Sequence, residues 1–348
     1  MVEKQINTDS DNNASSINPV TLMDVARQAG VSPSTVSRIL NGTAKVSADK
    51  RKAVETAIEQ MHFEPNQLAQ SLKSGRSMTI GIVVQDISSP FFDETLRGVD
   101  DGLKGTGYAS VIVSGHWDAQ EEAARIKLLL ARKVDGIILL SGHIADKDVL
   151  HFSHQKPIVA TGRALQSETA IGFKLDNENG AYLAVRHLIE LGHRRIAFVT
   201  GPADNSDASE RLLGYQRALK SANLEFDANL VVEGDFHEAS GLVAVNRLFD
   251  TQQQFSAVFA ANDQIAYGVR LSLYRKGIRV PDDISLIGFD DLPGSLYTTP
   301  PLTTIHQPLY DMGLLATTTL LGLISGKKVD VELPKLELIV RETTRRFR

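Results

Sequence analysis

The chain has 348 residues, of which 42% are hydrophobic, and its formal net charge is −5. This length predicts about two domains with room for a small appended one, and a sequence without cysteine excludes disulfides, thiolate metal sites and cysteine nucleophiles. The negative net charge of the chain alone argues against binding of nucleic acid. Residues 20–76, however, carry eight basic and five acidic side chains, which favours a local phosphate-binding surface there.

The first nineteen residues lack the apolar segment of a secretory signal. No later run of the sequence approaches the roughly 18 apolar residues that a membrane span requires. We therefore expect residues 1–19 to be disordered and the protein to be cytoplasmic, with no membrane partner.

The residues after this tail predict a helix, a turn and a second helix. The apolar residues of "LMDVARQAG" form one helical stripe between the hydroxyl of Thr21 and the terminating Gly30, which predicts a helix over about 22–29. Pro33 stands at the first position of a second helix over about 33–41, where its missing N–H costs nothing. Two short helices joined by a turn with a glycine form the helix-turn-helix pattern.

A third apolar stripe after Ser47 is expected to close a three-helix core. We expect Val36 and Leu40 of the second helix to face this core. The third stripe consists of Ala53, Val54, Ala57, Ile58 and Met61.

The opposite face of the second helix carries polar side chains. In a helix-turn-helix this face enters the major groove of DNA. The guanidinium of Arg38 can bond both major-groove acceptors of a guanine, and hydroxyl groups can reach base edges or phosphates. A merely solvated helix face is the alternative. The candidate DNA-binding residues of this part are Thr21, Ser32, which is also placed to cap the second helix, Ser34, Thr35, Ser37, Arg38 and Asn41.

The segment "PNQLAQSLKSGRS", residues 65–77, predicts a short further helix. Pro65 stops the third helix, and Asn66 can cap a new one. Its apolar residues, Leu68, Ala69 and Leu72, are too few to form a core of their own. The segment therefore needs a partner, unless it is an ordinary linker.

From residue 79 onward, short β-rich runs alternate with helical patterns. The runs are "TIGIVV", "SVIVS", "DGIILL" and "IVAT", and then "RIAFVT", "LVVEG", "AVFAA" and "ISLIGF". Such alternation predicts parallel sheets covered by helices on both faces, in two sets over roughly 79–175 and 176–301. Ligands of open parallel sheets bind at the carboxyl ends of the strands.

Motifs of common enzymes are incomplete in this sequence. "GLISGKK" at 322–328 has three residues between its glycines where a P-loop needs four, and "GTG" at 105–107 lacks the third glycine of a dinucleotide fingerprint. The sequence contains no HExxH or GxSxG motif, and its nine histidines show no metal-binding spacing. We therefore expect no catalytic site, metal or cofactor.

Aromatic and polar residues that follow the predicted strands are candidates for binding a ligand. Aromatic rings offer flat apolar platforms to the C–H face of a sugar, while Arg, Asn and Asp make directional bonds to hydroxyl groups. Core packing is the alternative for the phenylalanines, and a salt bridge is the alternative for Arg211 with Asp290. The residues in question are Phe91, Phe92, Arg211, Phe236, Asn262 and Asp290.

The consecutive segments "TLMDVARQAGVSPSTVSRILNG", "VSADKRKAVETAIEQMHFEPNQLAQSLKSGRS" and "IGIVV" resemble the LacI-type (lactose and galactose repressor) transcription regulators. The resemblance covers about residues 20–345. It implies an all-α helix-turn-helix headpiece and an α/β two-lobed core like a periplasmic binding protein, with parallel sheets, late crossings near Pro300 and a last helix near 311–325. The implied boundaries are 20–64 for the headpiece, 65–77 for a hinge helix and linker, and 78–348 for the core, with lobe 1 at about 78–175 plus 306–330 and lobe 2 at about 176–301.

The resemblance also implies how DNA is bound. Two chains form a homodimer on a palindromic operator, and the hinge helices order there. Leu72 is wedged into the central minor groove, and Lys73 beside it joins the DNA-binding residues. Wedging an apolar side chain between base steps bends the site and adds contacts. Nothing in the C-terminal sequence suggests a tetramerising coiled coil.

The resemblance places Phe92, Arg211, Phe236, Asn262 and Asp290 on positions that line the effector pocket, and Phe91, Arg163 and Asp207 are further candidates for binding the effector. Purine-responsive members carry Arg and Thr where this chain has Asn205 and Asp207, and several members carry Asp-Arg or Asp-Trp where it has Gly162-Arg163. These differences disfavour a purine and favour a neutral mono- or oligosaccharide. Trp117 is expected to pack at a helix start, with stacking on a long ligand as the alternative.

We therefore expect a transcription regulator, a repressor of carbohydrate-use genes, that releases or binds its operator in response to a sugar. A nucleoside or phosphoprotein corepressor is the alternative within the same fold. A periplasmic sugar-binding protein is opposed by the helix-turn-helix. A cytosolic sugar-modifying enzyme would need an acid/base pair in the cleft, for which Asp207 and Asp290 are the candidates.

Overall fold

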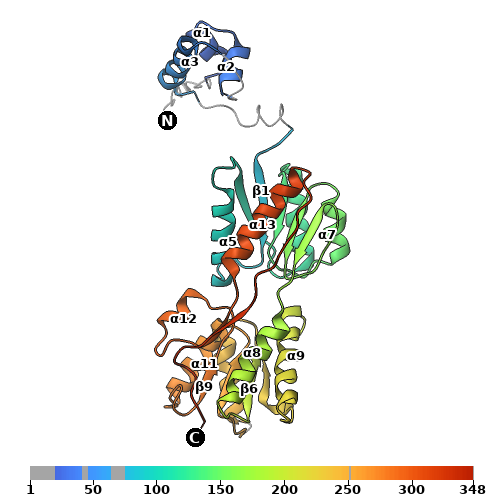
Figure 1. Ribbon diagram of the computed structural model, residues 1–348, viewed down its shortest axis with the longest axis vertical. Coiled ribbons are helices and arrows are strands. Elements are labelled where there is room, and N and C mark those ends of the chain that lie inside the picture. Colours follow the sequence, from blue (N-terminus) through green and yellow to red (C-terminus); the bar gives the residue numbers. More distant parts are fainter. Residues whose placement is uncertain (1–19, 41–45, 64–74, 251, 348) are drawn as a thin grey trace, which may run out of the picture. The chain divides into compact units, whose positions relative to one another are not determined.

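The structure is a computed structural model that describes residues 20–40, 46–63, 75–250 and 252–347 (Figure 1). The chain forms two compact units, Met1–Gly75 and Arg76–Arg348. The predicted disordered tail, the candidate DNA contact Asn41 and most of the predicted hinge segment, with Leu72 and Lys73, lie outside the described residues.

The first unit contains the predicted helix-turn-helix and a third helix. Thr21 and Asp24 form a capping box, in which the Asp24 N–H donates to Thr21 Oγ1 (3.3 Å) and the Thr21 N–H donates to Asp24 Oδ2 (3.0 Å). Gly30 has φ +63°, the left-handed conformation that ends a helix at low cost. The helices are α1 (Leu22–Gln28), α2 (Pro33–Leu40) and α3 (Ala48–Met61).

The core of this unit differs from the prediction at three positions. On α2, Ile39 is buried beside Val36, whereas Leu40 is half-buried at the edge of the cluster. Ala53 is exposed, because it lies one residue before Val54 and therefore about 100° around the helix from the buried row. The buried cluster consists of Val25, Ala26, Val36, Ile39, Val54, Ala57 and Phe63.

The second unit has two lobes. Lobe 1 is a parallel sheet of strand order β2-β1-β3-β4-β5. Helices α5 and α13 pack on one face around one apolar cluster, and α6 and α7 pack on the other face around a second cluster. The elements are β1 (Thr79–Val84), α5 (Pro90–Leu103), β2 (Ala109–Ser114), α6 (Ala119–Ala131), β3 (Gly136–Leu139), α7 (Asp146–Ser153), β4 (Ile158–Thr161), β5 (Ala170–Phe173) and α13 (Leu309–Ile324).

Lobe 2 is built around a parallel sheet of order β7-β6-β8-β9. The C-terminal residues also belong to it, because β10 pairs with β11 and the Leu286 N–H donates to the carbonyl of Thr343 (2.8 Å). The elements are α8 (Asn177–Glu190), β6 (Ile196–Thr200), α9 (Ser206–Ser221), the 3-10 turn η1 (Ala228–Leu230), β7 (Val231–Glu233), α10 (Glu238–Asp250), β8 (Ala257–Ala260), α11 (Asp263–Arg275), β9 (Ser285–Ile287), α12 (Pro293–Tyr297), β10 (Thr304–His306) and β11 (Glu337–Ile339).

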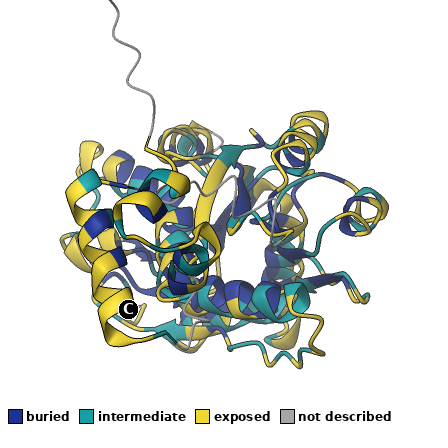
Figure 2. Ribbon diagram, turned by 90° about the horizontal axis from the view of Figure 1, so that it is seen from above, coloured by how far each residue is buried: buried dark blue, intermediate teal, exposed yellow. Residues whose placement is uncertain are grey.

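The chain passes between the lobes after β5, before α13 and after α13. The crossing expected near Pro300 comes slightly later, between β10 and α13, because Thr303 still forms a bridge with Ile287 of lobe 2. In the ribbon coloured by burial, helices carry exposed residues along one side and buried residues along the other (Figure 2). No helix among the described residues is long and apolar enough to cross a bilayer.

Helices α5 and α13 lie side by side on lobe 1 (Figure 1) and approach unusually closely. A Cβ on Gly98 of α5 would lie 2.1 Å from the Tyr310 carbonyl oxygen, and a Cβ on Gly313 of α13 would lie 2.0 Å from the Thr95 carbonyl oxygen. Only glycine permits this backbone contact. The two helices therefore form one tightly packed pair.

Candidate functional site

A cavity of about 350 Å³ lies between the two lobes, where the carboxyl ends of the strands face each other. Seven of the eight predicted ligand residues line it, and these are Phe91, Phe92, Asp207, Arg211, Phe236, Asn262 and Asp290. The sequence prediction missed several other lining residues. They are Asp86, Ser89, Ser141, His143, Pro202, Asp204, Asn205, Asp235, His237 and Gln264, and Trp117 joins them although it was expected to pack at a helix start.

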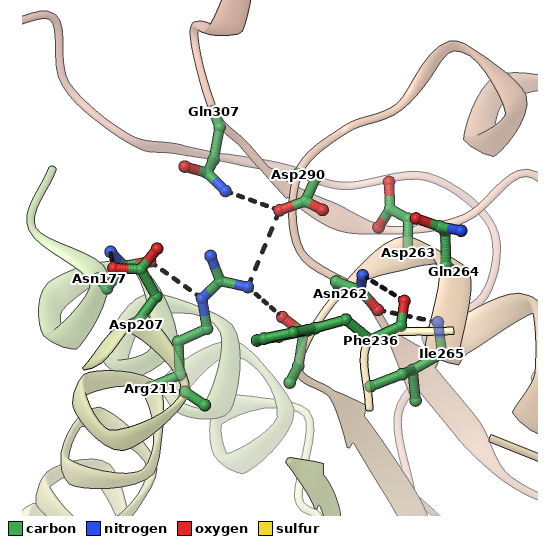
Figure 3. Close-up of polar contacts among 12 residues, drawn as sticks. Asn177, Asp207, Arg211, Phe236, Asn262, Asp263, Gln264, Ile265, Asp290 and Gln307 are labelled. Atoms are coloured by element: carbon green, nitrogen blue, oxygen red, sulfur yellow. Dashed lines mark hydrogen bonds and ion pairs between the residues drawn. The ribbon is translucent and has the colours of Figure 1, made fainter. Parts of the chain in front are cut away.

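Arg211 is buried in the wall that lobe 2 contributes (Figure 3). Its Nε donates to Asn177 Oδ1 (2.9 Å), and its Nη1 donates to the Ala261 carbonyl (2.6 Å) and lies 3.8 Å from Asp290 Oδ1. The guanidinium carbon also lies 3.8 Å from the centroid of the Phe289 ring. These contacts fix the guanidinium plane, and among the described residues its Nη2 has no acceptor, so this group is available to a ligand.

Asp290 follows β9 and faces Arg211 within the same lobe. Its Oδ1 accepts a hydrogen bond of 2.6 Å from Nε2 of Gln307, which directly precedes the cap of α13. Burial raises the pKa of Asp290 to about 8, although Arg211 opposes this rise. A carboxyl that holds its proton near neutral pH can both donate to and accept from a ligand hydroxyl.

Asp207, in the first turn of α9, is the second carboxyl of this wall. Its Oδ1 accepts a hydrogen bond from Nδ2 of Asn177 (3.1 Å), the residue that also holds Arg211. Burial raises the pKa of Asp207 as well, and Arg211 partly offsets the effect. Asn177 thus ties Asp207 and Arg211 into one hydrogen-bonded wall (Figure 3).

Asn262 lines the cavity, but its amide is already engaged. Its Oδ1 caps α11 by accepting from the Ile265 N–H (2.9 Å), and its Nδ2 donates to the Phe236 carbonyl (2.9 Å). Phe236 has φ +67°, a conformation that costs energy for a bulky residue. Asn262 therefore holds the Phe236 loop in place, and this ring lines the cavity 5.8 Å from the Arg211 guanidinium.

Arg163 is the predicted ligand residue that does not line the cavity. Its Nη1 donates to the Ile144 carbonyl (2.6 Å) and to Asp146 Oδ1 (2.9 Å), and its Nη2 donates to the Gly142 carbonyl (2.7 Å). Both terminal nitrogens of this guanidinium therefore bind the segment that follows β3. Trp117 precedes the Asp118 cap of α6, and its ring also lines the cavity, 6.4 Å from the ring of Phe92.

No group of three or more metal-ligating side chains occurs among the described residues. The carboxyls of Asp207 and Asp290 are both bonded to neighbouring amides, which suits binding a polar ligand. The lining residues include five aspartates and a single arginine, so the cavity does not favour an anion.

Known proteins match both units. Residues 21–66 match the bacterial regulatory proteins of the lacI family, and residues 185–344 match a periplasmic binding protein-like domain. The HTH-type transcriptional repressor PurR of Edwardsiella ictaluri is 33% identical over 315 residues, which are 90% of this chain and 92% of the relative. The ribose operon repressor of Escherichia coli K12 is 36% identical over 324 residues, which are 92% and 98%.

The chain belongs to the LacI family. A crystal structure of the lac repressor dimer bound to operator and the anti-inducer ONPF is similar, with TM-score 0.85, 30% identity and coverage of 94% of this chain and 100% of that one. A complex of the transcriptional regulator CelR with cellobiose has TM-score 0.70, 35% identity and coverage of 93% and 99%. The protein is therefore a DNA-binding transcriptional repressor of a family regulated by small-molecule effectors, and the predicted fold class is confirmed.

In this LacI-family regulator, α2 carries four of the nine residues predicted to contact DNA, which are Ser34, Thr35, Ser37 and Arg38. Ser32 Oγ accepts from the Thr35 N–H (3.2 Å), which confirms the predicted cap, and it lies 2.9 Å from the hydroxyl of Ser34. The exposed Arg38 donates from Nε to the Ser34 carbonyl (3.2 Å). Ser32 and Thr35 thus help to begin the helix, while Ser34 and Arg38 present exposed polar groups on its surface.

Proposed function

We propose that this regulator represses carbohydrate-use genes in the cytoplasm and that a neutral sugar bound between the lobes sets its operator affinity. The observation that carries the proposal is the composition of the cavity wall. Rings of Phe91, Phe92 and Phe236 supply apolar platforms, and the buried Arg211 and Asp290 supply directional hydrogen bonds. The cellobiose complex of CelR and the name of the ribose operon repressor are consistent with a sugar.

The two positions at which purine-responsive members carry Arg and Thr support the same choice. Asn205 caps α9, with its Oδ1 accepting from the N–H groups of Asp207 and Ala208. The carboxyl of Asp207 is engaged with Asn177. Neither side chain offers the positive charge of the arginine found in purine-responsive members. A nucleoside effector remains the alternative that a binding test must include.

The homodimer is part of this proposal. Strand β2 lies at the edge of the lobe 1 sheet, and its Val111 and Ile112 are exposed. On lobe 2, Tyr274 of α11 and Tyr297 of α12 are 78% and 80% exposed. An unpaired apolar edge and exposed tyrosines are typical of a surface that another chain covers. The similar lac repressor structure is a dimer.

Helix α13 is the proposed link between effector and DNA. Its 16 residues span about 24 Å at 1.5 Å per residue. Gln307, which bonds Asp290, directly precedes its N-terminal cap, and the carbonyl of its last residue, Ile324, accepts from Arg76 Nη2 (3.4 Å). Arg76 begins the second unit. A ligand that changes the contacts of Asp290 would therefore act on a helix whose last residue contacts Arg76, which lies in the predicted 65–77 segment.

A thermal-shift screen of neutral sugars and nucleosides, followed by calorimetry, tests the ligand class. A sugar that binds the native state raises the melting temperature. Asp290→Ala and Arg211→Ala should each weaken its binding by about tenfold to a hundredfold, because each removes a buried hydrogen-bonding group of the cavity wall, which is charged in the case of Arg211. Glu225→Ala, an exposed carboxylate remote from the cavity, is the control. Selective binding of a nucleoside, or unchanged sugar affinity in folded variants, would refute the proposal.

A further inference from the structure

A second chamber of about 400 Å³ adjoins the cavity. Its lining includes Gly142 and Gly162 of lobe 1 and Ser206 of lobe 2, none of which lines the first chamber. The residues that line both chambers are Trp117, Ser141, His143, Asp204, Asn205 and Asp207. The two chambers are therefore continuous, and they meet beside Trp117 and His143.

A row of aromatic rings runs along the lobe 1 side of both chambers. The centroids of Phe91 and Phe92 are 5.1 Å apart, those of Phe92 and Trp117 are 6.4 Å apart, and those of Trp117 and His143 are 5.5 Å apart. The rings follow β1, β2 and β3 in turn. Phe91 and Phe92 line only the first of these chambers, whereas Trp117 and His143 line both.

The lobe 2 side of the second chamber is polar. It consists of the segment that begins α9, from Asp204 to Asp207. Carboxyl, amide and hydroxyl groups there face a wall of aromatic rings. Apolar ring faces on one side and hydrogen-bonding groups on the other match the two chemical faces of a pyranose ring.

Buried polar contacts hold the loop that lines the second chamber. Glu122 is fully buried, and its carboxylate accepts from the N–H groups of His143 and Ile144 (both 2.8 Å). Arg163 binds the carbonyls of Gly142 and Ile144 on the same loop. Two charged side chains thus fix the loop that carries His143, and a preorganised wall lowers the cost of binding. This arrangement accounts for Arg163, which the sequence had assigned to the ligand itself.

We propose that the effector is a neutral carbohydrate of at least two sugar rings. One ring occupies the first chamber beside Arg211 and Asp290. The next ring lies on Trp117 and His143 in the second chamber and bonds the start of α9. This inference rests on the proposed function, because it assigns the size of the sugar that the same site binds.

Calorimetry on the full chain tests this assignment with glucose, galactose and ribose against cellobiose, maltose, lactose and cellotriose. At least one of the oligosaccharides should bind about tenfold or more tightly than any of the monosaccharides. Trp117→Ala should remove most of that advantage and weaken monosaccharide binding by a clearly smaller factor, because a monosaccharide keeps Arg211 and Asp290 while the second ring loses the face on which it lies. Trp117→Phe should retain part of it. Phe226→Ala, which removes an exposed aromatic ring elsewhere, is the control.

The outcomes separate the two proposals. If a monosaccharide binds as tightly as every oligosaccharide, or if Trp117→Ala weakens both classes equally in a folded protein, the two-chamber assignment is wrong and the sugar site stands. If no carbohydrate binds the parent protein, the proposed function fails and this inference fails with it.

Discussion

Single carboxyls in and behind the cavity wall combine burial with strong hydrogen bonds. Asp263, fully buried at the start of α11, accepts from Thr304 Oγ1 (2.6 Å), the Leu292 N–H (2.8 Å) and Ser295 Oγ (2.6 Å), and burial raises its pKa to about 7. Asp290 beside it has its pKa raised to about 8. Buried hydrogen bonds therefore hold this part of lobe 2, and Asp290 is mostly neutral below about pH 8.

These raised pKa values predict how stability depends on pH. Asp290 binds its proton more tightly in the folded chain than in the unfolded chain, where the pKa is 3.8. Its contribution is full below pH 3.8 and is lost as the pH rises through about 8. The melting temperature of Asp290→Asn should therefore decline less between pH 6 and pH 9 than that of the parent chain. Parallel curves in scanning calorimetry would contradict the assignment.

Arg38 is the residue on which operator specificity should depend most. Arg38→Ala should cost about 1 to 3 kcal/mol at a specific operator if the guanidinium makes a bidentate guanine contact, and binding to random DNA should change little. Fluorescence anisotropy at one salt concentration measures both. Equal losses on operator and random DNA would reduce Arg38 to a phosphate contact.

At the scale of elements, the pairing of α5 with α13 connects the site to the rest of lobe 1. Helix α5 begins with Phe91 and Phe92 at the cavity, and α13 begins just after Gln307. Because backbone meets backbone at Gly98 and Gly313, the two helices should move together when a ligand moves either end.

Gly98→Ala should destabilise the second unit by about 1 to 3 kcal/mol, because its Cβ would overlap the Tyr310 carbonyl and force the helices apart. Thr318→Ala, on the exposed face of α13, is the control and should have little effect. Urea unfolding followed by circular dichroism measures both. An unchanged midpoint for Gly98→Ala would show that this contact is loose.

The sequence predicted the elements that have strong local patterns. The eight β-rich runs all became strands, because each is an apolar run bounded by turns. Strands β5, β10 and β11 were missed, and for β10 and β11 the pairing depends on a partner about thirty residues away that no local pattern reveals. Stacking of Trp117 on a ligand was only the alternative in the sequence analysis, although Trp117 follows β2 by three residues, as Asp86 follows β1 by two. The role of Arg163 could not be found, because it depends on a loop folded against Glu122.

The whole protein is expected to bind one operator as two chains. Tyr297→Asp combined with Val111→Asp should convert a dimer into monomers in sedimentation velocity, because each places a charge on an exposed surface that we propose the second chain covers. Operator affinity should fall with it, since two helix-turn-helix units read mirrored half-sites. Lys220→Asp, on α9, is the charge-changing control. An unchanged sedimentation coefficient in the double variant would place the dimer contact elsewhere.

We expect a sugar bound between the lobes to control operator binding. Its most direct test is an anisotropy titration of an inverted-repeat operator, selected from random DNA, with and without a saturating oligosaccharide identified by calorimetry. The sugar should change the operator Kd of the parent chain by about fivefold or more. Asp290→Ala should bind the operator but not respond at the same sugar concentration. An operator Kd that stays the same while the sugar is bound would contradict it.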